Sequence, residues 1–376
     1  MKINTITCHD VYNVGASLQA YALVKYLNNL GYDTEIIDYK PPYLEHYKLT
    51  GVDNPAYDRP IFRQAYQILK FPMRLVNRLS KRKKVFDNFT KKYLPRTERK
   101  YTSMVELREN LPYADLYIAG SDQIWNPLFR NGKDPAFFLN FAPDNSRKIS
   151  YAASFAVDDI SEEDRNRMEQ WLKRLDAISV RETSGVALLR SMNLQGTQVC
   201  DPVFLLDDLE WKQLAVYPKE VRYLFVYDFD NNEQLQLIAR KLAKKGNLKI
   251  VSVFPMKGAD MVYGDMGPKE FIGTICNAEI IISNSFHATA FSIIFEKEFY
   301  VINRKEQINT RMRDLLLEIG LEKCLVSFSG EIESNDSIVW ESVNNKMNMI
   351  INRSKSFLKR QVEMVINTGG DENERA

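Results

Sequence analysis

The residues best suited to do chemistry stand directly after a short apolar run, at Ser283–His287. Ile280–Ile282 has the pattern of a buried strand, and Ala288–Phe295 that of a helix. A histidine at this place would lie at a helix N-terminus, where the dipole lowers the imidazole pKa. A dianionic ligand would raise that pKa again. We therefore expect His287 to act as a proton donor or phosphate ligand, the alternative being a histidine that only packs.

Three neighbours of His287 belong to the same predicted turn. They are Ser283, Asn284 and Ser285. Their hydroxyl and amide groups can bind an anion or a sugar hydroxyl, so we count them among the expected substrate-binding residues.

A second strand exit, Cys8–Gln19, leads from an apolar run into a helix. Gly15 would let backbone N–H groups approach an anion at the start of the helix, with Ser17 and Gln19 on the first turn. Asn13 is also counted among the expected substrate-binding residues. The run is neither GxGxxG nor a P-loop, so it gives little support to nucleotide-phosphate binding. Alternatively, Ser17 caps the helix and Gly15 only makes a turn.

The third exit, Gly120–Pro127, combines Ser121, Asp122, Gln123 and Trp125 in one short loop. This mixture suits a sugar, because the polar groups can bind hydroxyls while the aromatic face covers the ring. The alternative is an ordinary Asp/Ser turn with Trp125 in the core.

Two further exits are Tyr151–Ala156, which contains Ser154, and Ser179–Glu182, which contains Arg181. The small residues of the first would allow a neighbouring loop or a ligand to approach closely. Arg181 would lie at the lip of a cleft, where its planar guanidinium suits a carboxylate or phosphate. A structural ion pair with Glu182 or another acid is the alternative.

These exits need parallel sheets to bring them together. Short β-rich runs alternate with longer helical patterns, which favours an α/β fold, and 376 residues favour more than one core. In open parallel sheets, ligands bind beyond the carboxyl ends of the strands. We therefore predict two Rossmann-like domains facing across a cleft.

The predicted boundaries follow the composition. We expect an N-terminal domain over 1–205 with a basic helical insertion at about 60–100, and a C-terminal domain over 206–340. A closing helix over 341–368, packing back on the N-terminal domain, and a disordered tail over 369–376 complete the chain.

Positive charge is concentrated in that insertion. Residues 60–100 hold thirteen Lys and Arg against two acids, a net charge of +11, while the remainder carries −9. The segment is either a solvated helical face or a surface for anionic lipid or a lipid-linked pyrophosphate. No nucleic-acid motif accompanies it, so we expect no nucleic-acid partner.

The cysteines and histidines limit the other functional classes. Four cysteines lie far apart without a CxxC pair, and no signal peptide is evident, which favours a cytoplasmic location. Three histidines and no His/Cys cluster make a zinc site improbable. No apolar run has the length of a membrane span, although peripheral contact with the membrane is compatible with the basic insertion.

Taken in order, these runs resemble the polysaccharide pyruvyl transferase family from about residue 4 to residue 320. The matching runs are Asn13–Leu23, Gly120–Asn126, Tyr151–Phe155, Ser179–Glu182, Asp201–Val203, Gly267–Phe271 and Ser285–Ser292. The resemblance implies a GT-B-like fold. It also implies transfer of pyruvate from phosphoenolpyruvate onto two hydroxyls of a glycan or lipid-linked saccharide, as a cyclic ketal, with release of phosphate and without a metal or redox cofactor.

In this scheme His287 is the candidate acid, and Asp122 a base or sugar ligand. Many family members carry arginine where this chain has Ser285, so anion binding would fall to Arg181 with Arg311. Positions that are usually glycine in relatives are Ala156 and Ala288. Two other functions remain open: a GT-B glycosyltransferase using a sugar nucleotide, and a non-catalytic glycan-binding partner in envelope assembly.

Overall fold

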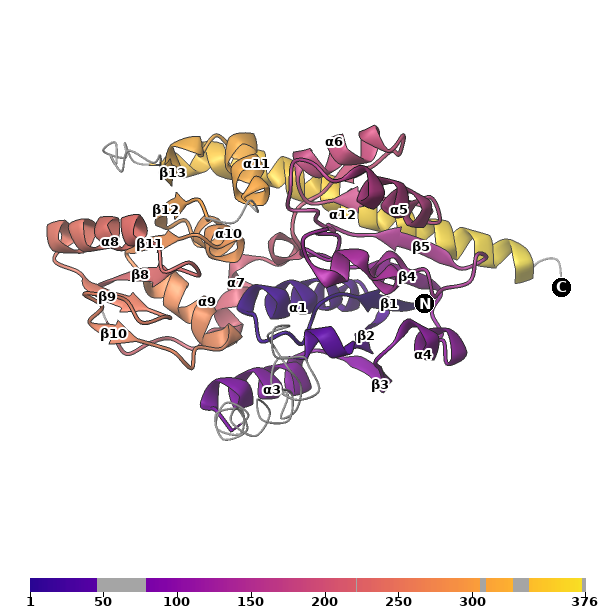
Figure 1. The fold of residues 1–376 in the computed structure, drawn as a ribbon, viewed down its shortest axis with the longest axis horizontal. Helices are drawn as coiled ribbons and strands as arrows, with labels where there is room; N and C mark the ends of the chain where they lie inside the picture. Colours follow the sequence, from indigo (N-terminus) through magenta and orange to yellow (C-terminus); the bar gives the residue numbers. More distant parts are fainter. Residues whose placement is uncertain (46–78, 221, 305–308, 327–337, 374–376) are drawn as a thin grey trace, which may run out of the picture.

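The structure is a computed structural model that describes residues 1–45, 79–220, 222–304, 309–326 and 338–373. Two large parallel sheets with helices packed on them, and one two-stranded sheet, make up the described chain (Figure 1). Residues 60–78, which belong to the expected basic insertion, lie outside the described part.

The first sheet comes from the N-terminal half and is parallel throughout, in the order β3-β2-β1-β4-β5. Its strands are β1 (Lys2–Ile6), β2 (Asp33–Tyr39), β3 (Arg96–Tyr101), β4 (Leu116–Ala119) and β5 (Arg147–Ser150). Parallel bridges at Ile149–Ala177 and Ala153–Val180 place the short pair β6 (Ser179–Val180) and β7 (Thr197–Gln198) beside β5. The inner strand β4 is buried along its whole length, which explains its uninterrupted apolar sequence.

The helices of this half are α1 (Val14–Asn29), α3 (Lys81–Tyr93), α4 (Met104–Glu109), α5 (Glu162–Leu172) and α6 (Thr183–Ser191). Helix α1 begins at Val14, within the predicted strand exit Cys8–Gln19. Asn13 is its cap, because the Asn13 side chain accepts a hydrogen bond from the Ala16 N–H at 3.2 Å. The capping role considered for Ser17 therefore belongs to Asn13.

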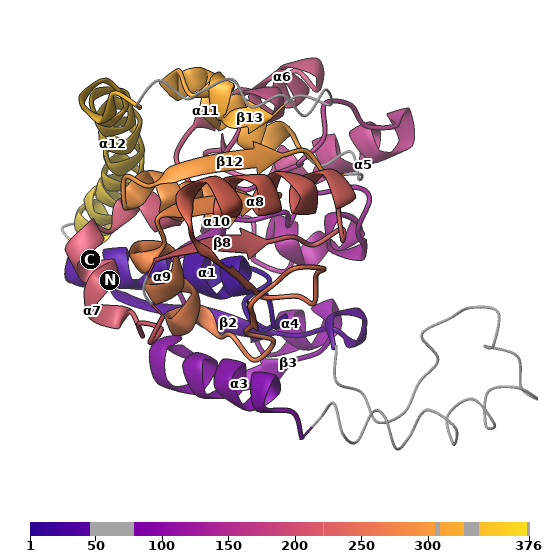
Figure 2. The same cartoon turned by 90° about the vertical axis from the view of Figure 1, so that its left-hand side faces the viewer.

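The second sheet, also parallel, has the order β10-β9-β8-β11-β12-β13. Its strands are β8 (Tyr223–Tyr227), β9 (Lys249–Ser252), β10 (Met261–Val262), β11 (Ile280–Ser283), β12 (Glu298–Ile302) and β13 (Leu325–Val326). The accompanying helices are α7 (Asp208–Leu214), α8 (Glu233–Gly246), α9 (Pro268–Asn277), α10 (Phe286–Ile294) and α11 (Thr310–Ile319). Figure 2 looks onto this half, with α8 in front of the sheet.

The last helix, α12 (Trp340–Asn373), runs back along the first half (Figure 1). Ser354 Oγ accepts the Cys200 N–H at 2.8 Å, and the Arg147 guanidinium donates to Gln361 at 2.9 Å. The helix extends to Asn373, beyond Gly369, where the sequence predicts a tail.

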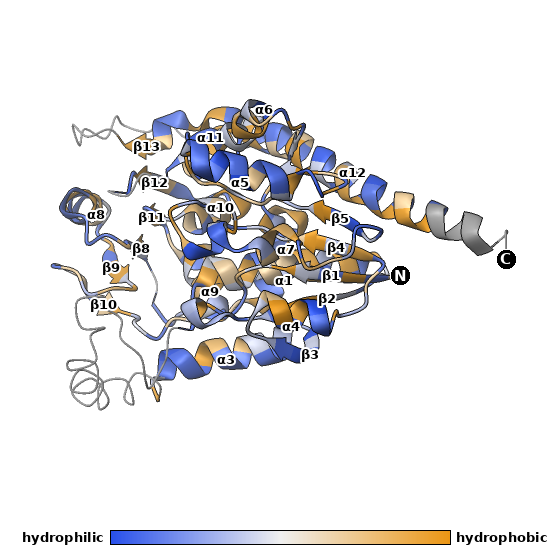
Figure 3. Cartoon of the chain, turned by 45° about the vertical axis from the view of Figure 1, so that its right-hand side comes forward, coloured by the Kyte–Doolittle hydropathy of each residue, from blue (hydrophilic) through white to orange (hydrophobic). Residues whose placement is uncertain are grey.

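Aromatic side chains connect the two halves beneath the cleft. The Trp211 ring of α7 lies 5.7 Å from Tyr21 in α1 and 4.9 Å from Phe291 in α10, measured between ring centroids. Figure 3 shows much of the strand β4 in hydrophobic colours and much of α3 in hydrophilic ones. The apolar contact through Trp211 fixes α1 and α10 relative to each other, and these two helices carry the loops of the site.

Candidate functional site

The strand exits of the two sheets meet at a pocket of about 270 Å³. Seven of the residues expected from the sequence line it: Asn13, Asp122, Gln123, Asn284, Ser285, His287 and Arg311. They come from both halves of the chain, so neither half forms this pocket alone. Segments far apart in the sequence thus meet at one place, as predicted for the carboxyl ends of strands in parallel sheets.

His287 stands at the second position of α10, with Ser285 as the cap residue. The Ser283 hydroxyl fixes the turn before it, accepting the Ser285 N–H at 2.9 Å and donating to the Tyr227 carbonyl at 2.8 Å. His287 is buried, and its Nε2 has no hydrogen-bond partner among the described residues. This nitrogen lies 3.7 Å from Asp201 Oδ2, beyond hydrogen-bond distance.

The surroundings of His287 favour neutral imidazole. Burial lowers its pKa below the usual 6.5; Asp201 and Asp122 oppose this effect, while Arg181 and Arg311 reinforce it. The sequence predicts the same direction from the helix dipole, but burial is the largest cause. A buried nitrogen without a partner can therefore receive a proton when an added anion changes the balance of charge.

Arg181 lies behind the pocket as part of a buried ion-pair network. Its guanidinium bonds to Asp201 and, at 3.3 Å, to Asp122, and its side chain is 2% exposed. The guanidinium carbon also lies 4.4 Å from the centroid of the Phe286 ring. Burial would lower the Arg181 pKa, but Asp201 and Asp122 outweigh it and raise the pKa. Arg181 thus matches the structural alternative, with partners other than Glu182.

Asp122 connects this network to the pocket. Its Oδ1 lies 3.3 Å from nitrogens of both Arg181 and Arg311, and its backbone adopts a left-handed φ of 73°. Burial would raise its pKa, but Arg181, His287 and Arg311 together lower it. Burial and the nearby Arg181 lower the Arg311 pKa to about 10, so Arg311 still carries its charge at neutral pH.

Ser121 and Ser154 do not face the pocket. The Ser121 hydroxyl donates to Asp201 at 3.3 Å, and the Ser154 hydroxyl to Glu182 Oε1 at 2.9 Å. Glu182 also accepts the N–H of Ala156 at 3.0 Å. Burial raises the Glu182 pKa even though Arg181 opposes it. Ala156 has a φ of 60°, a backbone conformation that favours glycine.

Gly15 lies directly against the histidine, whereas Gln19 is directed elsewhere. A Cβ atom on Gly15 would lie 1.9 Å from His287 Nδ1, so only glycine allows α1 to approach this ring. Gln19 is fully buried and its amide donates to Thr7 Oγ1 and the Ala16 carbonyl, both at 3.0 Å. Gln19 supports the loop and is not a pocket residue.

The expected sugar-stacking role of Trp125 is wrong for this structure. Trp125 is fully buried, its Nε1–H donates to the Phe137 carbonyl at 3.0 Å, and its ring stacks on Phe138 with centroids 5.4 Å apart. An indole enclosed in this way has no face available to a ligand. The core alternative is correct because the apolar segment at 135–139 folds over the loop.

Several residues of the site are not predicted from the sequence. Asp201, which pairs with Arg181 behind the pocket, stands in the sequence only as part of the family run Asp201–Val203, although it follows β7 and the strand-exit rule points to it. Arg304 and Phe286 also lack a signal of their own, as do the exposed aromatics Phe129 and Phe229. Their placement depends on the packing of the two halves, which no local pattern contains.

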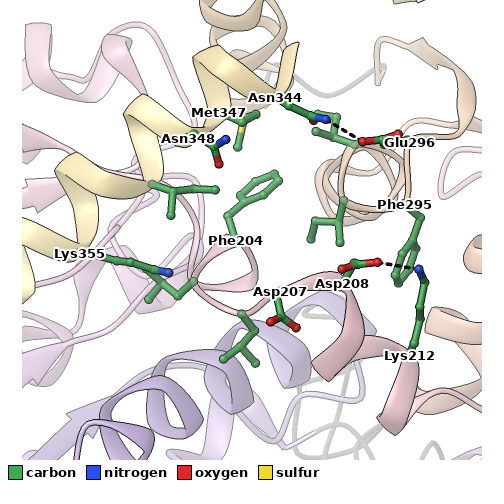
Figure 4. A pocket seen from close by; sticks show the side chains of 15 residues that line it. Phe204, Asp207, Asp208, Lys212, Phe295, Glu296, Asn344, Met347, Asn348 and Lys355 are labelled. Atoms are coloured by element: carbon green, nitrogen blue, oxygen red, sulfur yellow. Dashed lines mark hydrogen bonds and ion pairs between the residues drawn. The ribbon is translucent and has the colours of Figure 1, made fainter. Parts of the chain in front are cut away.

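A larger hollow of about 560 Å³ lies between α12, α7 and the end of α10 (Figure 4). Two pairs of its polar groups bond to each other: Lys212 to Asp208 at 2.6 Å, and Asn344 to Glu296 at 2.7 Å. It contains no histidine or arginine. The smaller pocket at His287 is therefore the better candidate for chemistry.

Within the described residues no group of three or more His, Cys, Asp or Glu is arranged to hold a metal ion. No helix in the described part of the chain is both long and apolar enough to cross a membrane.

The model of one protein family, described as polysaccharide pyruvyl transferase, matches residues 13–306, which include every residue of this pocket except Arg311 and Met312. The chain belongs to the polysaccharide pyruvyl transferase family. No curated protein matches it.

Solved structures resemble this pyruvyl transferase family member in fold. UDP-GlcNAc 2-epimerase from Neisseria meningitidis, bound to UDP-GlcNAc, has a TM-score of 0.51 at 12% identity over 96% of this chain and 100% of its own. The S. aureus MnaA–UDP structure has a TM-score of 0.53 at 11% identity over 97% of each chain. The predicted fold class is confirmed: an α/β protein with two Rossmann-like domains in a GT-B-like arrangement.

Proposed function

We propose that this transferase moves the pyruvyl group of phosphoenolpyruvate onto two hydroxyls of a glycan sugar, forming a cyclic ketal and releasing phosphate. Membership of the family supports the transferase class. The observation that carries the chemistry is the buried Nε2 of His287, which lacks a partner in a pocket that Arg311 also lines. A proton carrier beside a fixed cation is what protonation of an anionic enol ester needs.

In the proposed first step, His287 donates a proton to the terminal carbon of phosphoenolpyruvate, and C2 becomes an oxocarbenium-like centre. The first sugar hydroxyl adds to C2, and its proton returns to His287. The second hydroxyl then displaces phosphate from C2, and its proton leaves with the phosphate. The protons of the two hydroxyls thus balance: the first replaces the proton that His287 gave to the new methyl group, and the second leaves on phosphate.

Asp122 is better suited to bind a sugar hydroxyl than to act as a strong base. Its lowered pKa keeps it ionised, so it accepts hydrogen bonds well but holds a proton poorly. Located between Arg181 and Arg311, it can orient a hydroxyl towards C2. We assign Asp122 to acceptor positioning.

Arg311 is the preferred anchor for the donor. Arg181 already bonds to two carboxylates, whereas the Arg311 guanidinium meets only Asp122 among the ion pairs of the described residues. Ser285 and the N-terminus of α10 add hydroxyl and backbone N–H groups on the same side. A phosphate or carboxylate of the donor would share Arg311 with Asp122.

We further propose a cytoplasmic protein that meets a glycan or lipid-linked acceptor near an anionic membrane. Lys81, Lys84, Lys91 and Lys92 of α3 are exposed and give this helix a positive face. Binding to anionic vesicles should exceed binding to neutral vesicles and weaken with salt. Equal binding to both kinds of vesicle would exclude the membrane contact.

The main experiment measures phosphate release from phosphoenolpyruvate with a panel of acceptor glycans. Wild type should release phosphate and His287→Gln should not, while glycan binding persists in both. Calorimetry with phosphoenolpyruvate and with sugar nucleotides tests the donor separately. Tight binding of a sugar nucleotide without binding of phosphoenolpyruvate would replace this proposal with glycosyl transfer.

A further inference from the structure

Helix α3 belongs to the first half of the chain but contacts both halves. Despite its many lysines, its inner side is buried through Phe86 and Phe89. Arg82, near its start, reaches two separate backbone segments: one nitrogen donates to the Tyr12 carbonyl at 3.1 Å and another to the Met266 carbonyl at 3.2 Å. Tyr12 precedes α1, and Met266 precedes α9 of the second half. One guanidinium therefore joins the two halves.

On the first side, α3 encloses Tyr12. The Tyr12 hydroxyl donates to Asp87 at 3.0 Å, and its ring meets Phe86 edge-on with centroids 6.0 Å apart. Tyr12 also holds a left-handed φ of 52°, a conformation that its surroundings must impose. The next residue, Asn13, caps α1 and lines the pocket.

On the second side, α3 packs closely against the loop before α9. A Cβ on Gly267 would lie 2.1 Å from Val85 Cγ1. The backbone of this loop therefore lies directly against a side chain of α3. Lys269 donates to the Tyr93 hydroxyl at 3.3 Å, and Met266 itself is 3% exposed. The contact is therefore a packed interface with directed hydrogen bonds.

A second polar contact joins the halves at α11. Arg313 binds Asp158 through two nitrogens at 2.6 and 2.9 Å, and Asp314 accepts the Ser184 N–H at 2.8 Å. In Figures 1 and 2, α3 lies at one edge of the molecule, with α11 and α6 at the opposite edge. Loosening the α3 connection therefore leaves the contacts at α11 and at Trp211 in place.

We propose that Arg82 is a positioning residue that holds the loop of Tyr12 to the second half and thereby keeps Gly15 against His287. The planar fork of arginine suits this role, because two of its nitrogens reach two carbonyls at once, which a lysine ammonium cannot do in the same geometry. Without the fork, the loop and α9 separate at the α3 edge of the cleft. His287 then loses the wall that fixes its ring.

The structural part is tested by hydrogen exchange on the full chain without substrate. Two amides report on it: that of Ser17, bonded to Asn13 O at 3.1 Å, and that of Phe271, bonded to Gly267 O at 3.0 Å. In Arg82→Met, both should exchange on the order of tenfold faster than in wild type, since the lost bonds join charged and neutral groups. Arg82→Lys should behave like Arg82→Met, and Lys84→Met, on the exposed face of the same helix, should match wild type.

Because the consequence for turnover rests on the proposed pyruvyl transfer, it is measured separately. Phosphate release should show a lower kcat in Arg82→Met and Arg82→Lys, with a smaller change in KM for phosphoenolpyruvate. If both arginine variants exchange like Lys84→Met, or if Arg82→Lys restores wild-type exchange, the connection by Arg82 is wrong. If the Arg82 variants exchange faster but the wild type does not use phosphoenolpyruvate, the connection by Arg82 is supported and the proposed pyruvyl transfer is rejected.

Discussion

Gly15 and His287 touch across the junction of the two domains. A Cβ atom at position 15 would lie 1.9 Å from His287 Nδ1, a separation that real Cβ contacts essentially never show. The starts of α1 and α10 can thus approach this closely only because residue 15 has no side chain. This contact restricts the orientation of the imidazole, which general acid catalysis requires.

Gly15→Ala should therefore displace the imidazole or open the cleft. We expect phosphate release from phosphoenolpyruvate to fall by about 100-fold, since a shift of about 1 Å in a catalytic group has that effect. Gly264→Ala is the matched control, because a Cβ there meets nothing within 4 Å among the described residues. Steady-state kinetics of both variants, with circular dichroism to confirm folding, make the comparison. Equal activity in the two would show that the contact is unimportant for turnover.

When the donor binds, the protein should take up a proton from solution on His287. In the free protein burial lowers the His287 pKa below 6.5, so the ring is neutral at pH 7.5. The negative charge of bound phosphoenolpyruvate raises this pKa. The donor itself is almost fully deprotonated at pH 7.5, because phosphate monoesters have a second pKa of about 6, so it cannot supply the proton. Calorimetry in two buffers of different ionisation enthalpy should show proton uptake in wild type and none in His287→Gln. Uptake that persists in the variant would assign the proton to another group.

The same pKa predicts how acid affects the fold. The unfolded chain binds a proton on this histidine near about 6.5, whereas the folded chain binds it only at lower pH. The folded state is therefore progressively disfavoured as pH falls through 6.5. Between pH 7.5 and 5.5, the free energy of unfolding of wild type should decrease more than that of His287→Gln in denaturant titrations. Parallel curves would mean that His287 titrates normally.

The two arginines should separate stability from donor binding. Arg181 is 2% exposed and paired with Asp201, whose side chain is 0% exposed, so Arg181→Met leaves an unpaired buried carboxylate. We expect a loss of about 3–5 kcal/mol in the free energy of unfolding. Arg311→Met should cost less stability and raise the KM for phosphoenolpyruvate more. A reversed pattern would make Arg181 the donor anchor.

Local sequence patterns were sufficient for the secondary structure that places the site. The apolar run at Ile280–Ile282 and the polar turn after it predict β11, α10 and the place of His287, because strand burial and helix capping are decided by near neighbours. Asn13, rather than Ser17, caps α1, which places the cap four residues earlier in the chain. Such errors at element ends reflect competition between adjacent capping residues.

Partners across the sequence could not be predicted in the same way. Arg181 was expected at a strand exit, but its pairing with Asp201 and Asp122 depends on how β4, β6 and the loop at Asp201 pack. The contact of Gly15 with His287 joins residues from different domains. Neither relationship has a local signature, because each results from two segments meeting in space.

Trp125 offers a direct test of the difference between a core residue and a ligand residue. Its Nε1–H donates to the Phe137 carbonyl at 3.0 Å and its ring stacks on Phe138. Trp125→Phe leaves that buried carbonyl without its donor, which should lower the free energy of unfolding by about 1–3 kcal/mol. The KM for acceptor glycan should stay unchanged, whereas Phe229→Ala, at a residue that lines the pocket, should raise it. Denaturant unfolding and acceptor kinetics, measured on both variants, distinguish the roles. A raised acceptor KM in Trp125→Phe with unchanged stability would return Trp125 to the sugar site.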